Sequence, residues 1–391
     1  MADKGLDISV VTLELQFICE LIGSRKGFDL PGREEVYRHL NWDSFLDLAK
    51  HHRVYPNVYQ ILTSLQLDYV PEKVMEELRK ECSSNAFTML RLAAESGELS
   101  ERLSNEGIRV LALKGPVLAQ ELYGSYALRT SKDLDILVSM DDARHADAVL
   151  KEMGYVPKSE LPHISVAWKW REHHWCYAHP QKRIQVELHW RLNSDLGSEP
   201  GFEELWSARK SCQITGKPVH YLGSDHLISY LLSHGCRHGW FRLRWLSDIQ
   251  TLIDHGTDWE GVVRHLQQYG QEFAAGQAMV LLTALFRTKP PAGTEKLMNE
   301  RSQQLASASL KFIMDPTPIT QAKRSYWSYL FSLKSTRQKS AFIMLYLLPG
   351  QRDAATIKLP RQLHFMYFVL RPFLWGWRQI AMRGDKREAK A

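Results

Sequence analysis

The most constraining stretch of this chain is Asp133-Leu134-Asp135-Ile136-Leu137-Val138, in which two carboxylates interrupt an apolar run. The apolar run predicts a buried β-strand. Side chains of a strand point alternately to opposite faces, so Asp133 and Asp135 share one face and most of the apolar residues share the other. Two like charges so close require a cation between them, or a proton on one of them. The pattern therefore predicts a divalent metal site, and the alternative is a half-exposed edge strand that carries ordinary solvated acids.

A second apolar run, Arg109-Val110-Leu111-Ala112-Leu113, precedes this strand and ends at Lys114-Gly115-Pro116. This order predicts a strand, a tight turn and a helix over residues 117–123. Pro116 suits the first helical position, and Gly115 suits the cap before it. The free N–H groups at such a helix start attract anions, so Gly115 and Lys114 are candidates for phosphate binding. An ordinary strand-to-helix turn with a surface lysine would have the same sequence.

A third carboxylate, Glu187, lies in the alternating segment Ile184-Gln185-Val186-Glu187-Leu188-His189-Trp190. The alternation predicts a strand with Glu187 and His189 on the same face. Sheet pairing of this strand with the strand of the two aspartates would bring Glu187 beside them. The run from Ala167 to Tyr177 predicts a further strand, joined to this one by a turn at residues 178–182.

These segments together resemble the uncharacterised bacterial nucleotidyltransferase family, within the DNA polymerase β-like superfamily. The resemblance extends over residues 40 to 290 or so. The broad superfamily has Gly-Gly or Gly-Ser at the phosphate turn, whereas this chain has Lys114-Gly115-Pro116. The residues that carry the resemblance are Leu113-Lys114-Gly115, Tyr123, Arg129, Asp133-Leu134-Asp135-Ile136-Leu137-Val138, Val186-Glu187-Leu188-His189-Trp190 and Trp245-Leu246-Ser247-Asp248-Ile249.

The resemblance implies an enzyme that moves a nucleoside monophosphate from a nucleoside triphosphate, ATP in the first instance, to a hydroxyl group. The acceptor would be a small molecule, a peptide or a polysaccharide precursor. The implied cofactor is Mg²⁺, as two ions held by Asp133, Asp135 and Glu187, with Mn²⁺ as a substitute. Glu187 would also help to deprotonate the acceptor hydroxyl. The competing prediction is a catalytically silent protein of the same fold that binds a phosphorylated ligand or a peptide.

Four further residues are candidates for contact with nucleotide or substrate. Arg129, together with Lys114, is a candidate for the phosphates, and the alternative is a plain loop arginine. His189 would orient a carboxylate or contact the acceptor. The alternative is a structural histidine whose hydrogen bonds are satisfied within the protein. The helical segment 242–249 is expected to close the cleft, with Arg244 and Asp248 toward the substrate; alternatively, these charges form salt bridges within the protein.

Histidine occurs 16 times, so a zinc site has to be considered. His234 and His238 have the i,i+4 spacing of a helical metal pair. However, Gly235 and Gly239 argue against a regular helix there, and the sequence places no third ligand. We therefore expect a helix-end turn around residues 235–239 and hydrogen bonding by the strand-face histidines, and His173-His174-Trp175-Cys176 is the other dense cluster.

Four regions are predicted along the chain. They are an N-terminal helical region (1–106), a nucleotidyltransferase α/β core (107–222), a helical bundle that closes the cleft (223–290) and a C-terminal helical extension with a basic, aromatic tail (291–391). The fold class is therefore α+β, a small mixed β-sheet flanked by helical regions on both sides. Helices are expected at 10–21, 42–49, from 71 onward, 82–103, 141–153, 225–233, 241–254, 259–269 and 271–286.

Composition restricts the class of partner and the compartment. A formal net charge of +6 over 391 residues is compatible with phosphate-bearing ligands but is no nucleic-acid-binding signature. Five scattered cysteines without C-x-x-C spacing argue against a disulfide framework and indicate the reducing cytoplasm. The N-terminus lacks a signal-peptide pattern, and no run of about 18 apolar residues predicts a transmembrane helix.

The C-terminal tail combines aromatic and basic residues from Leu363 to Arg378. We expect a final helix docked on its own domain, followed by a solvated charged end. A weak contact with a membrane surface or a partner protein is the alternative. Pro372 is expected to break or to start a helix.

Overall fold

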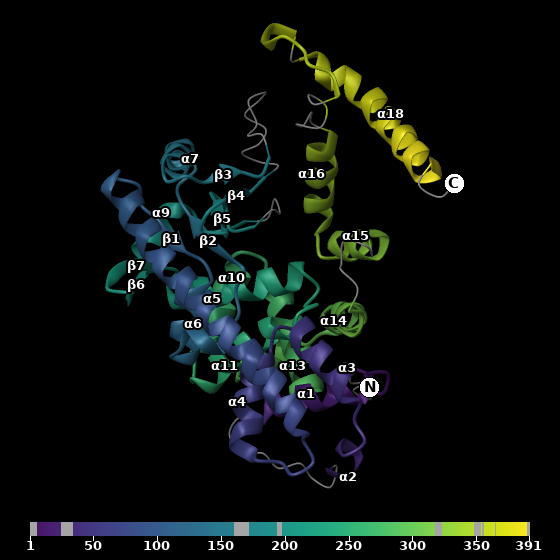
Figure 1. Cartoon of the computed structure of the whole chain (residues 1–391). Helices are drawn as coiled ribbons and strands as arrows, with labels where there is room; N and C mark the ends of the chain where they lie inside the picture. The colour runs from purple at the N-terminus through teal and green to yellow at the C-terminus, as the bar shows by residue number, and fades with distance from the viewer. Residues whose placement is uncertain are drawn as a thin grey trace.

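The computed structural model describes residues 6–24, 34–159, 172–193, 198–316, 323–347, 353, 356–363 and 365–388. Within them, one mixed sheet is flanked by helices from both sides of the sequence (Figure 1). This arrangement is the α+β class that the sequence predicts. The strands of the sheet are β1 (Leu111–Ala112), β2 (Asp133–Leu137), β3 (Val156–Pro157), β4 (His174–His179), β5 (Ile184–His189), β6 (Lys210–Ile214) and β7 (Lys217–Tyr221).

The strand order in the sheet is β3-β4-β5-β2-β1-β7-β6. β2 runs parallel to β5 and β1 runs parallel to β7, whereas the other neighbours are antiparallel. β4 and β5 form the predicted hairpin, with a turn at residues 180–183. The first part of the predicted strand from Ala167 lies outside the described residues.

The helices are α1 (Leu13–Gly23), α2 (Glu34–Tyr37), α3 (Trp42–His51), α4 (Tyr55–Leu65), α5 (Glu72–Asn105), α6 (Pro116–Tyr123), α7 (Ala143–Glu152), α9 (Phe202–Ser207), α10 (Ser224–Arg237), α11 (Leu243–Asp254), α12 (Trp259–Gln268), α13 (Glu272–Phe286), α14 (Glu300–Met314), α15 (Lys323–Ser332), α16 (Thr336–Leu347) and α18 (Met366–Glu388). Short 3-10 turns are η1 (Tyr126–Leu128), η2 (Glu295–Leu297) and η3 (Arg361–Leu363). The predicted helices thus occur within a few residues of their expected bounds, apart from the two differences that follow.

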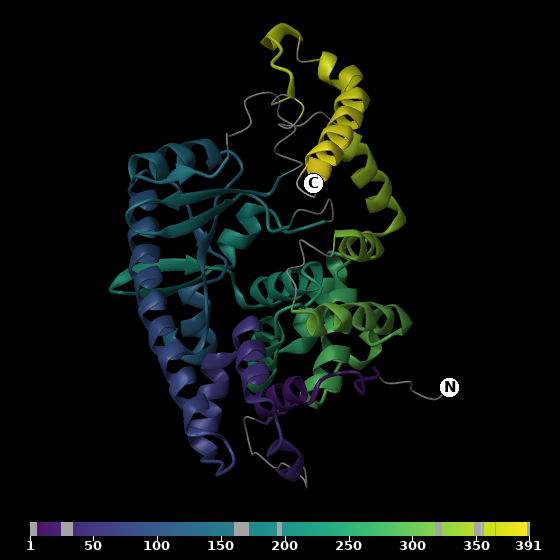
Figure 2. The same cartoon turned by 45° about the vertical axis from the view of Figure 1, so that its right-hand side comes forward.

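The long helix α5 replaces two predicted helices. The segment between Pro71 and Cys82 contains strong helix formers and neither glycine nor proline, so nothing separates the two parts. The first half of α5 contacts α4, and the second half covers the sheet. Figure 2 shows α5 along the edge of the molecule, beside the sheet.

Helix α10 extends past the predicted end at Ser233, through Gly235, and ends at Arg237, inside the range 235–239 where the sequence predicts a helix-end turn. The glycine is needed for packing, because a Cβ at position 235 would lie 2.3 Å from Cζ3 of Trp240. Trp240 is fully buried in the core. Close packing of this ring, and not a break in the helix, therefore explains the residue.

The apolar face of the sheet packs against α5 and α7. Leu134 and Ile136 of β2 and Val186 and Leu188 of β5 are at most 4% exposed and belong to one cluster with residues of both helices. Burial of this face fixes the register, because a shift by one residue would expose every apolar side chain. The carboxylates of β2 and β5 are consequently held on the opposite face.

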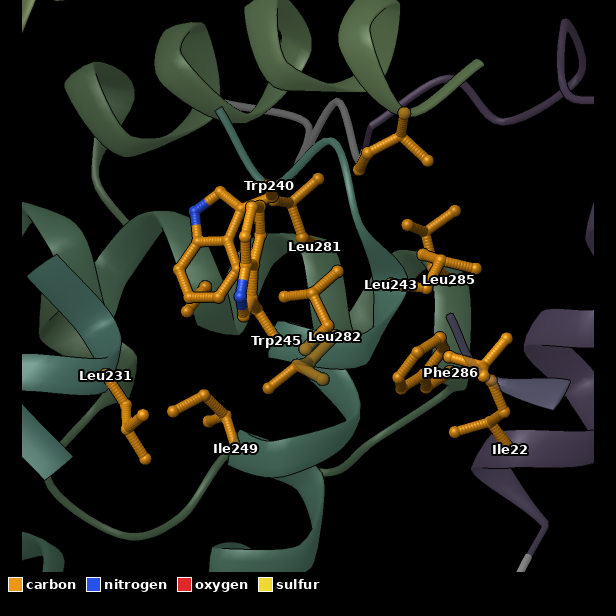
Figure 3. Packing of buried hydrophobic residues seen from close by; sticks show 14 of the residues in the cluster. Ile22, Leu231, Trp240, Leu243, Trp245, Ile249, Leu281, Leu282, Leu285 and Phe286 are labelled. Carbon is orange, nitrogen blue, oxygen red and sulfur yellow. The ribbon is translucent and has the colours of Figure 1, made fainter. Parts of the chain in front are cut away.

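Helices from both sides of the sequence share one hydrophobic core. A single cluster of buried residues extends from Val11 to Leu333 and includes members of α1, α3, α10, α11, α13 and α14. Figure 3 shows part of it, with Ile22 of α1 on the side of Phe286 of α13. A Cβ on Gly23 would lie 2.2 Å from the carbonyl oxygen of Phe286, so glycine permits this close approach. The first 106 residues are therefore packed together with the helices that follow the sheet.

The last helix, α18, lies apart from this core (Figure 1). Tyr367 and Leu374 are buried with Leu359 and Leu370 in a small cluster of their own. The helix continues through Pro372, which removes one backbone hydrogen bond without ending the helix. No helix in the described part of the chain is both long enough and apolar enough to cross a bilayer. Phe368, Val369, Phe373, Trp375 and Trp377 are 50–72% exposed.

Candidate functional site

The sheet brings the predicted acidic residues to one face. β2 and β5 are parallel, with Asp135 in register beside Glu187. Residues that are in register on neighbouring strands share a face, and so do alternate residues of one strand. Asp133, Asp135, Glu187 and His189 therefore lie on the face opposite α5. We call these four residues the acidic face.

His189 lies between two of the carboxylates. Its Nε2 is 3.5 Å from Asp135 Oδ1 and 3.4 Å from Glu187 Oε2. One donor atom from each of Asp135, Glu187 and His189 lies within 4.8 Å of the other two. The side chains of Asp135 and His189 are only 2% and 3% exposed. These three residues are the tightest part of the acidic face.

Two of these side chains carry buried polar atoms without a hydrogen bond in the described part of the chain. They are Asp135 Oδ1 and both ring nitrogens of His189. Asp135 Oδ1 has the Lys114 ammonium at 3.1 Å, whereas the His189 ring has no partner of hydrogen-bond geometry among the described residues. Buried polar atoms are nearly always satisfied in folded proteins, so the His189 ring points to a missing partner. A divalent cation is a partner that two carboxylates and an imidazole can share. The donor set of the acidic face therefore fits a metal ion.

Lys114 offsets part of the negative charge. Its Nζ is 3.1 Å from Asp135 Oδ1. Burial acts to raise the pKa of the Asp135 carboxyl, but the Lys114 ammonium and the His189 imidazole hold it well below its usual range. Burial likewise opposes ionisation of Glu187, whose pKa is nevertheless lowered by His189. Asp135 and Glu187 are thus anionic at neutral pH.

Asp133 lies slightly apart from the other acids. It belongs to none of the groups of closely spaced donor atoms found among the described residues. Burial, and then the charge of Asp135, raise the pKa of its carboxyl. Burial lowers the pKa of the Arg53 guanidinium, and the negative charge of Asp133 acts in the opposite direction. Asp133 therefore connects the acidic face to a neighbouring group of cations.

The turn before α6 has the predicted form. Gly115 is the N-cap with φ +80° and ψ −141°, a backbone conformation that only glycine adopts readily, and Pro116 is the first helical residue. A Cβ on Gly115 would be 3.6 Å from Leu134 Cδ2 and 3.7 Å from the Asp133 carbonyl oxygen. The start of α6 therefore lies directly against the strand that carries the aspartates.

Arg129 and Asp248 pair with each other. Nε and Nη2 of Arg129 donate to the Asp248 carboxylate at 3.0–3.1 Å, and each side chain is 1% exposed. The Tyr123 hydroxyl donates to the same carboxylate at 2.9 Å. A buried guanidinium requires an anionic partner, and α11 supplies it. This pair is the alternative that the sequence analysis gave for Asp248, a salt bridge within the protein, and both side chains are committed to each other.

A group of four cations lies near Asp133, and only Arg244 among them is a residue that the sequence singles out. Arg244 is 9% exposed, and its Nη1 donates to the carbonyl oxygen and, at 3.1 Å, to the hydroxyl of Thr130. None of the four forms an ion pair shorter than 4.0 Å with a described residue. We call them the cationic cluster: Arg53, Lys132, Arg242 and Arg244.

Mutual repulsion marks the cationic cluster as a site for an anion. Burial and Arg53 lower the pKa of Arg242 to about 10, and Arg53 is the main cause of the lowered pKa of Lys132. Like charges held together in this way attract polyanions. The Arg242-x-Arg244 spacing at the start of α11 is the sequence signal for this cluster, since Arg53 follows α3 and joins the cluster only through the fold.

The histidines of β4 complete the surroundings of the acidic face. His174 and Cys176 stand opposite His189 and Glu187 in the antiparallel pair β4–β5. His174 Nε2 is 3.9 Å from Glu187 Oε2, and the rings of His174 and His189 are stacked at 4.8 Å. Burial lowers the pKa of His174 to about 4, so its imidazole is neutral at pH 7.

The second histidine pair, on α10, is not part of any metal-ligand group among the described residues. The rings of His234 and His238 are 4.6 Å apart and contact Trp245. Burial lowers the pKa of both imidazoles well below the usual value. These two histidines therefore belong to the core.

Comparison with known proteins assigns the chain to a family. Residues 38–287, which include the whole sheet and the acidic face, match a family described as "Uncharacterised nucleotidyltransferase". A solved structure of an antigenic nucleotidyltransferase-like protein from Paracoccidioides brasiliensis is 14% identical, with 63% of this chain and 96% of that chain covered and a TM-score of 0.28. No curated protein matches the chain. Because the family match spans well over half of its residues, the chain belongs to the uncharacterised nucleotidyltransferase family.

Proposed function

We propose that this protein transfers a nucleoside monophosphate from a nucleoside triphosphate to a hydroxyl group, in a reaction that depends on a divalent cation. The proposed acceptor is a small molecule, a peptide or a polysaccharide precursor, and the proposed nucleotide is ATP. The observation that carries the proposal is the position of Asp135 and Glu187 side by side on one sheet face. Asp133 lies on the same face, and the start of α6 lies directly against it.

Asp133, Asp135 and Glu187 would hold the cations, for which we propose Mg²⁺, as two ions, with Mn²⁺ as a substitute. When bound, such ions neutralise the charge that develops during nucleotidyl transfer. Carboxylate oxygens are the ligands that these ions prefer, and Asp135 Oδ1 is buried without a hydrogen bond. Oxygen donors and a group of three closely placed carboxylates, of which Asp135 is buried, together support this assignment.

In the proposed reaction, the acceptor oxygen attacks the α-phosphorus of the triphosphate. A new P–O bond forms to the acceptor, the bond to the β-phosphate oxygen breaks, and pyrophosphate leaves. Glu187 would accept the proton of the acceptor hydroxyl and pass it to solvent. Its lowered pKa keeps it ionised, and its 28% exposed side chain can be reached by an acceptor.

The cationic cluster and Lys114 would bind the phosphates. Lys114 contacts Asp135, whereas Arg53 and Arg244 act on Asp133, so positive charge lies near both aspartates. Arg242 and Lys132 are more exposed than Arg244 and can reach a ligand. Arginine pairs well with phosphate because its fork of N–H groups donates two parallel hydrogen bonds. In this proposal, the cluster takes the role that the sequence gave to Arg129.

Nucleotide binding is tested first by thermal denaturation of the full chain with nucleoside triphosphates, with and without magnesium. We expect a rise in Tm that requires both ligands and is lost in Asp135→Asn. Stabilisation by nucleotide alone, unaffected by metal, would contradict a metal-dependent site.

Mass spectrometry of cell extract incubated with the protein, labelled ATP and magnesium then identifies the modified acceptor by its added mass.

Transfer is tested next with variants of the two aspartates. We expect Asp133→Asn and Asp135→Asn each to lower transfer by at least about 100-fold with an unchanged circular dichroism spectrum. The matched control is Glu101→Gln on α5, which removes an exposed acid paired with Lys217. An unfolded Asp→Asn variant would make that carboxylate a structural residue instead.

A further inference from the structure

We propose that His189 is itself a metal ligand, so that Asp135, Glu187 and His189 form a three-residue site that takes Mn²⁺ in preference to Mg²⁺. The inference deepens the proposed function, on which its catalytic meaning rests. It adds a nitrogen donor to the carboxylates, and a nitrogen donor changes which ion the site selects.

The spacing of the three donor atoms supports a shared ion. His189 Nε2 is 3.4 Å from Glu187 Oε2 and 3.5 Å from Asp135 Oδ1. Atoms that bind one ion at bond lengths of about 2.1 Å stand about 3.0–3.4 Å apart. The observed separations are close to this range, and the three atoms come from two adjacent strands whose register is fixed by the buried face.

The hydrogen bonding of His189 supports the same role. Neither ring nitrogen has a hydrogen-bond partner among the described residues, although the side chain is only 3% exposed. Its Nε2 lies at ion-pair distance from both carboxylates. A structural histidine at this depth would normally donate to a carbonyl or a carboxylate. A divalent cation between the ring nitrogen and the two carboxylates would satisfy all three buried groups.

The neighbouring side chains hold the ring in place. The imidazole of His174 stacks on His189 with an interplanar angle of 27°, and the ring of His173 lies at 5.5 Å. Lys114 contacts the Asp135 oxygen that the metal would use. The ammonium therefore competes with a cation for this oxygen, and we expect metal binding to strengthen when a triphosphate draws Lys114 away.

The donor set decides the preferred ion. Mg²⁺ requires hard oxygen ligands and rarely accepts imidazole, whereas imidazole suits the first-row transition ions. Two carboxylates with one imidazole leave positions for water and phosphate oxygens, an arrangement that Mn²⁺ tolerates. Zn²⁺ is the competing ion, because it binds the same atoms and prefers four ligands.

The test uses pulsed electron paramagnetic resonance of the full chain loaded with Mn²⁺, alone and with ATP. Direct coordination by His189 predicts a nitrogen hyperfine coupling to the bound ion. Protein labelled with ¹⁵N-histidine should show the coupling of that isotope, and this readout requires no variant. The coupling should vanish in His189→Gln and persist in the matched control His174→Gln.

Competition between ions tests the selectivity. We expect Mg²⁺ to displace bound Mn²⁺ only at an excess of at least tenfold, and His189→Gln to abolish this preference. A coupling that persists in His189→Gln, or that vanishes only in His174→Gln, would overturn the assignment. Loss of the nitrogen coupling when Mg²⁺ is present at a concentration equal to that of Mn²⁺ would overturn the preference for Mn²⁺.

The two proposals fail in different ways. Magnesium-supported transfer without a nitrogen coupling would reject His189 as a ligand and leave nucleotidyl transfer standing. The opposite outcome is a nitrogen coupling that depends on His189 in a protein that transfers no nucleotide to any acceptor. It would confirm His189 as a metal ligand and reject nucleotidyl transfer.

Discussion

The ion pair of Arg129 and Asp248 shows how one buried charge determines the role of another. Both side chains are 1% exposed, and the Tyr123 hydroxyl donates a further hydrogen bond to Asp248 at 2.9 Å. Removing one member of a buried pair leaves the other charge without compensation, which costs about 3–5 kcal/mol. We therefore expect Asp248→Asn to lower the free energy of unfolding by about this amount, as measured by urea denaturation.

An exposed pair provides the control for this prediction. Arg38 and Asp68 lie 3.1 Å apart with 41% and 76% exposed side chains, so Asp68→Asn should change stability little. A similar loss in both variants would show that burial does not decide the effect. If Asp248→Asn instead lost nucleotide binding at unchanged stability, Asp248 would contact the substrate after all.

At the scale of secondary-structure elements, helix α6 has a glycine in left-handed backbone conformation at each end. Gly115 before the helix has φ +80°, and Gly124 after it has φ +66°. The conformation of Gly115 is the rarer one, so Gly115→Ala should lower the free energy of unfolding by about 1–3 kcal/mol. We also expect it to weaken nucleotide binding, because the start of α6 lies against the aspartate strand.

Gly124→Ala is the matched control at the other end of α6. A Cβ there would meet no atom within 4 Å, so only backbone strain is introduced. Calorimetric titration with ATP and magnesium should show a loss of affinity for Gly115→Ala and not for Gly124→Ala. Equal affinities in the two variants would mean that the start of α6 takes no part in binding phosphate.

At the scale of the whole molecule, buried neutral histidines link stability to pH. Burial lowers the pKa of His51 to about 4, and those of His52, His234 and His238 lie well below the usual value. The unfolded chain takes up these protons near pH 6.5, whereas the folded chain does not. Stability is therefore fully present above pH 6.5 and decreases as the pH falls toward 4.

We expect the urea midpoint to fall between pH 7 and pH 5. His51 alone should contribute about 2 kcal/mol to this loss, so the loss should be smaller by that amount in His51→Gln. A midpoint that does not change with pH would mean that these imidazoles are protonated in the folded protein.

The separate packing of α18 gives a second prediction for the whole molecule. Among the described residues, its buried side chains Tyr367 and Leu374 cluster with Leu359 and Leu370 and not with the main core. Tyr329 of α15, in contrast, donates to the Cys236 carbonyl oxygen and lies in the main core. A chain that ends at residue 347 should therefore keep its Tm to within about 2 °C, and a chain that ends at residue 316 should lose several degrees. If calorimetry showed the same decrease in Tm for both shortened chains, α18 would contribute to the stability of the core.

The sequence alone was sufficient wherever a local pattern decides the structure. Alternation placed Asp133 and Asp135 on one strand face, and the order Gly115-Pro116 predicted the start of α6, because both depend only on neighbouring residues. Helical spacing likewise located the helices between residues 224 and 286 to within a few residues. The α+β class followed from these elements.

Only the tertiary structure decided what each charged side chain contacts. Arg129 pairs with Asp248 across 119 positions, and Arg53 joins the cationic cluster from α3's end, since partners of this kind meet only when separate elements pack. The position of His189 between Asp135 and Glu187 depends on strand register, which burial of the opposite sheet face fixes. Local sequence thus determined the elements, whereas long-range packing determined their electrostatic partners, because Coulomb interactions depend on distance in space and not along the chain.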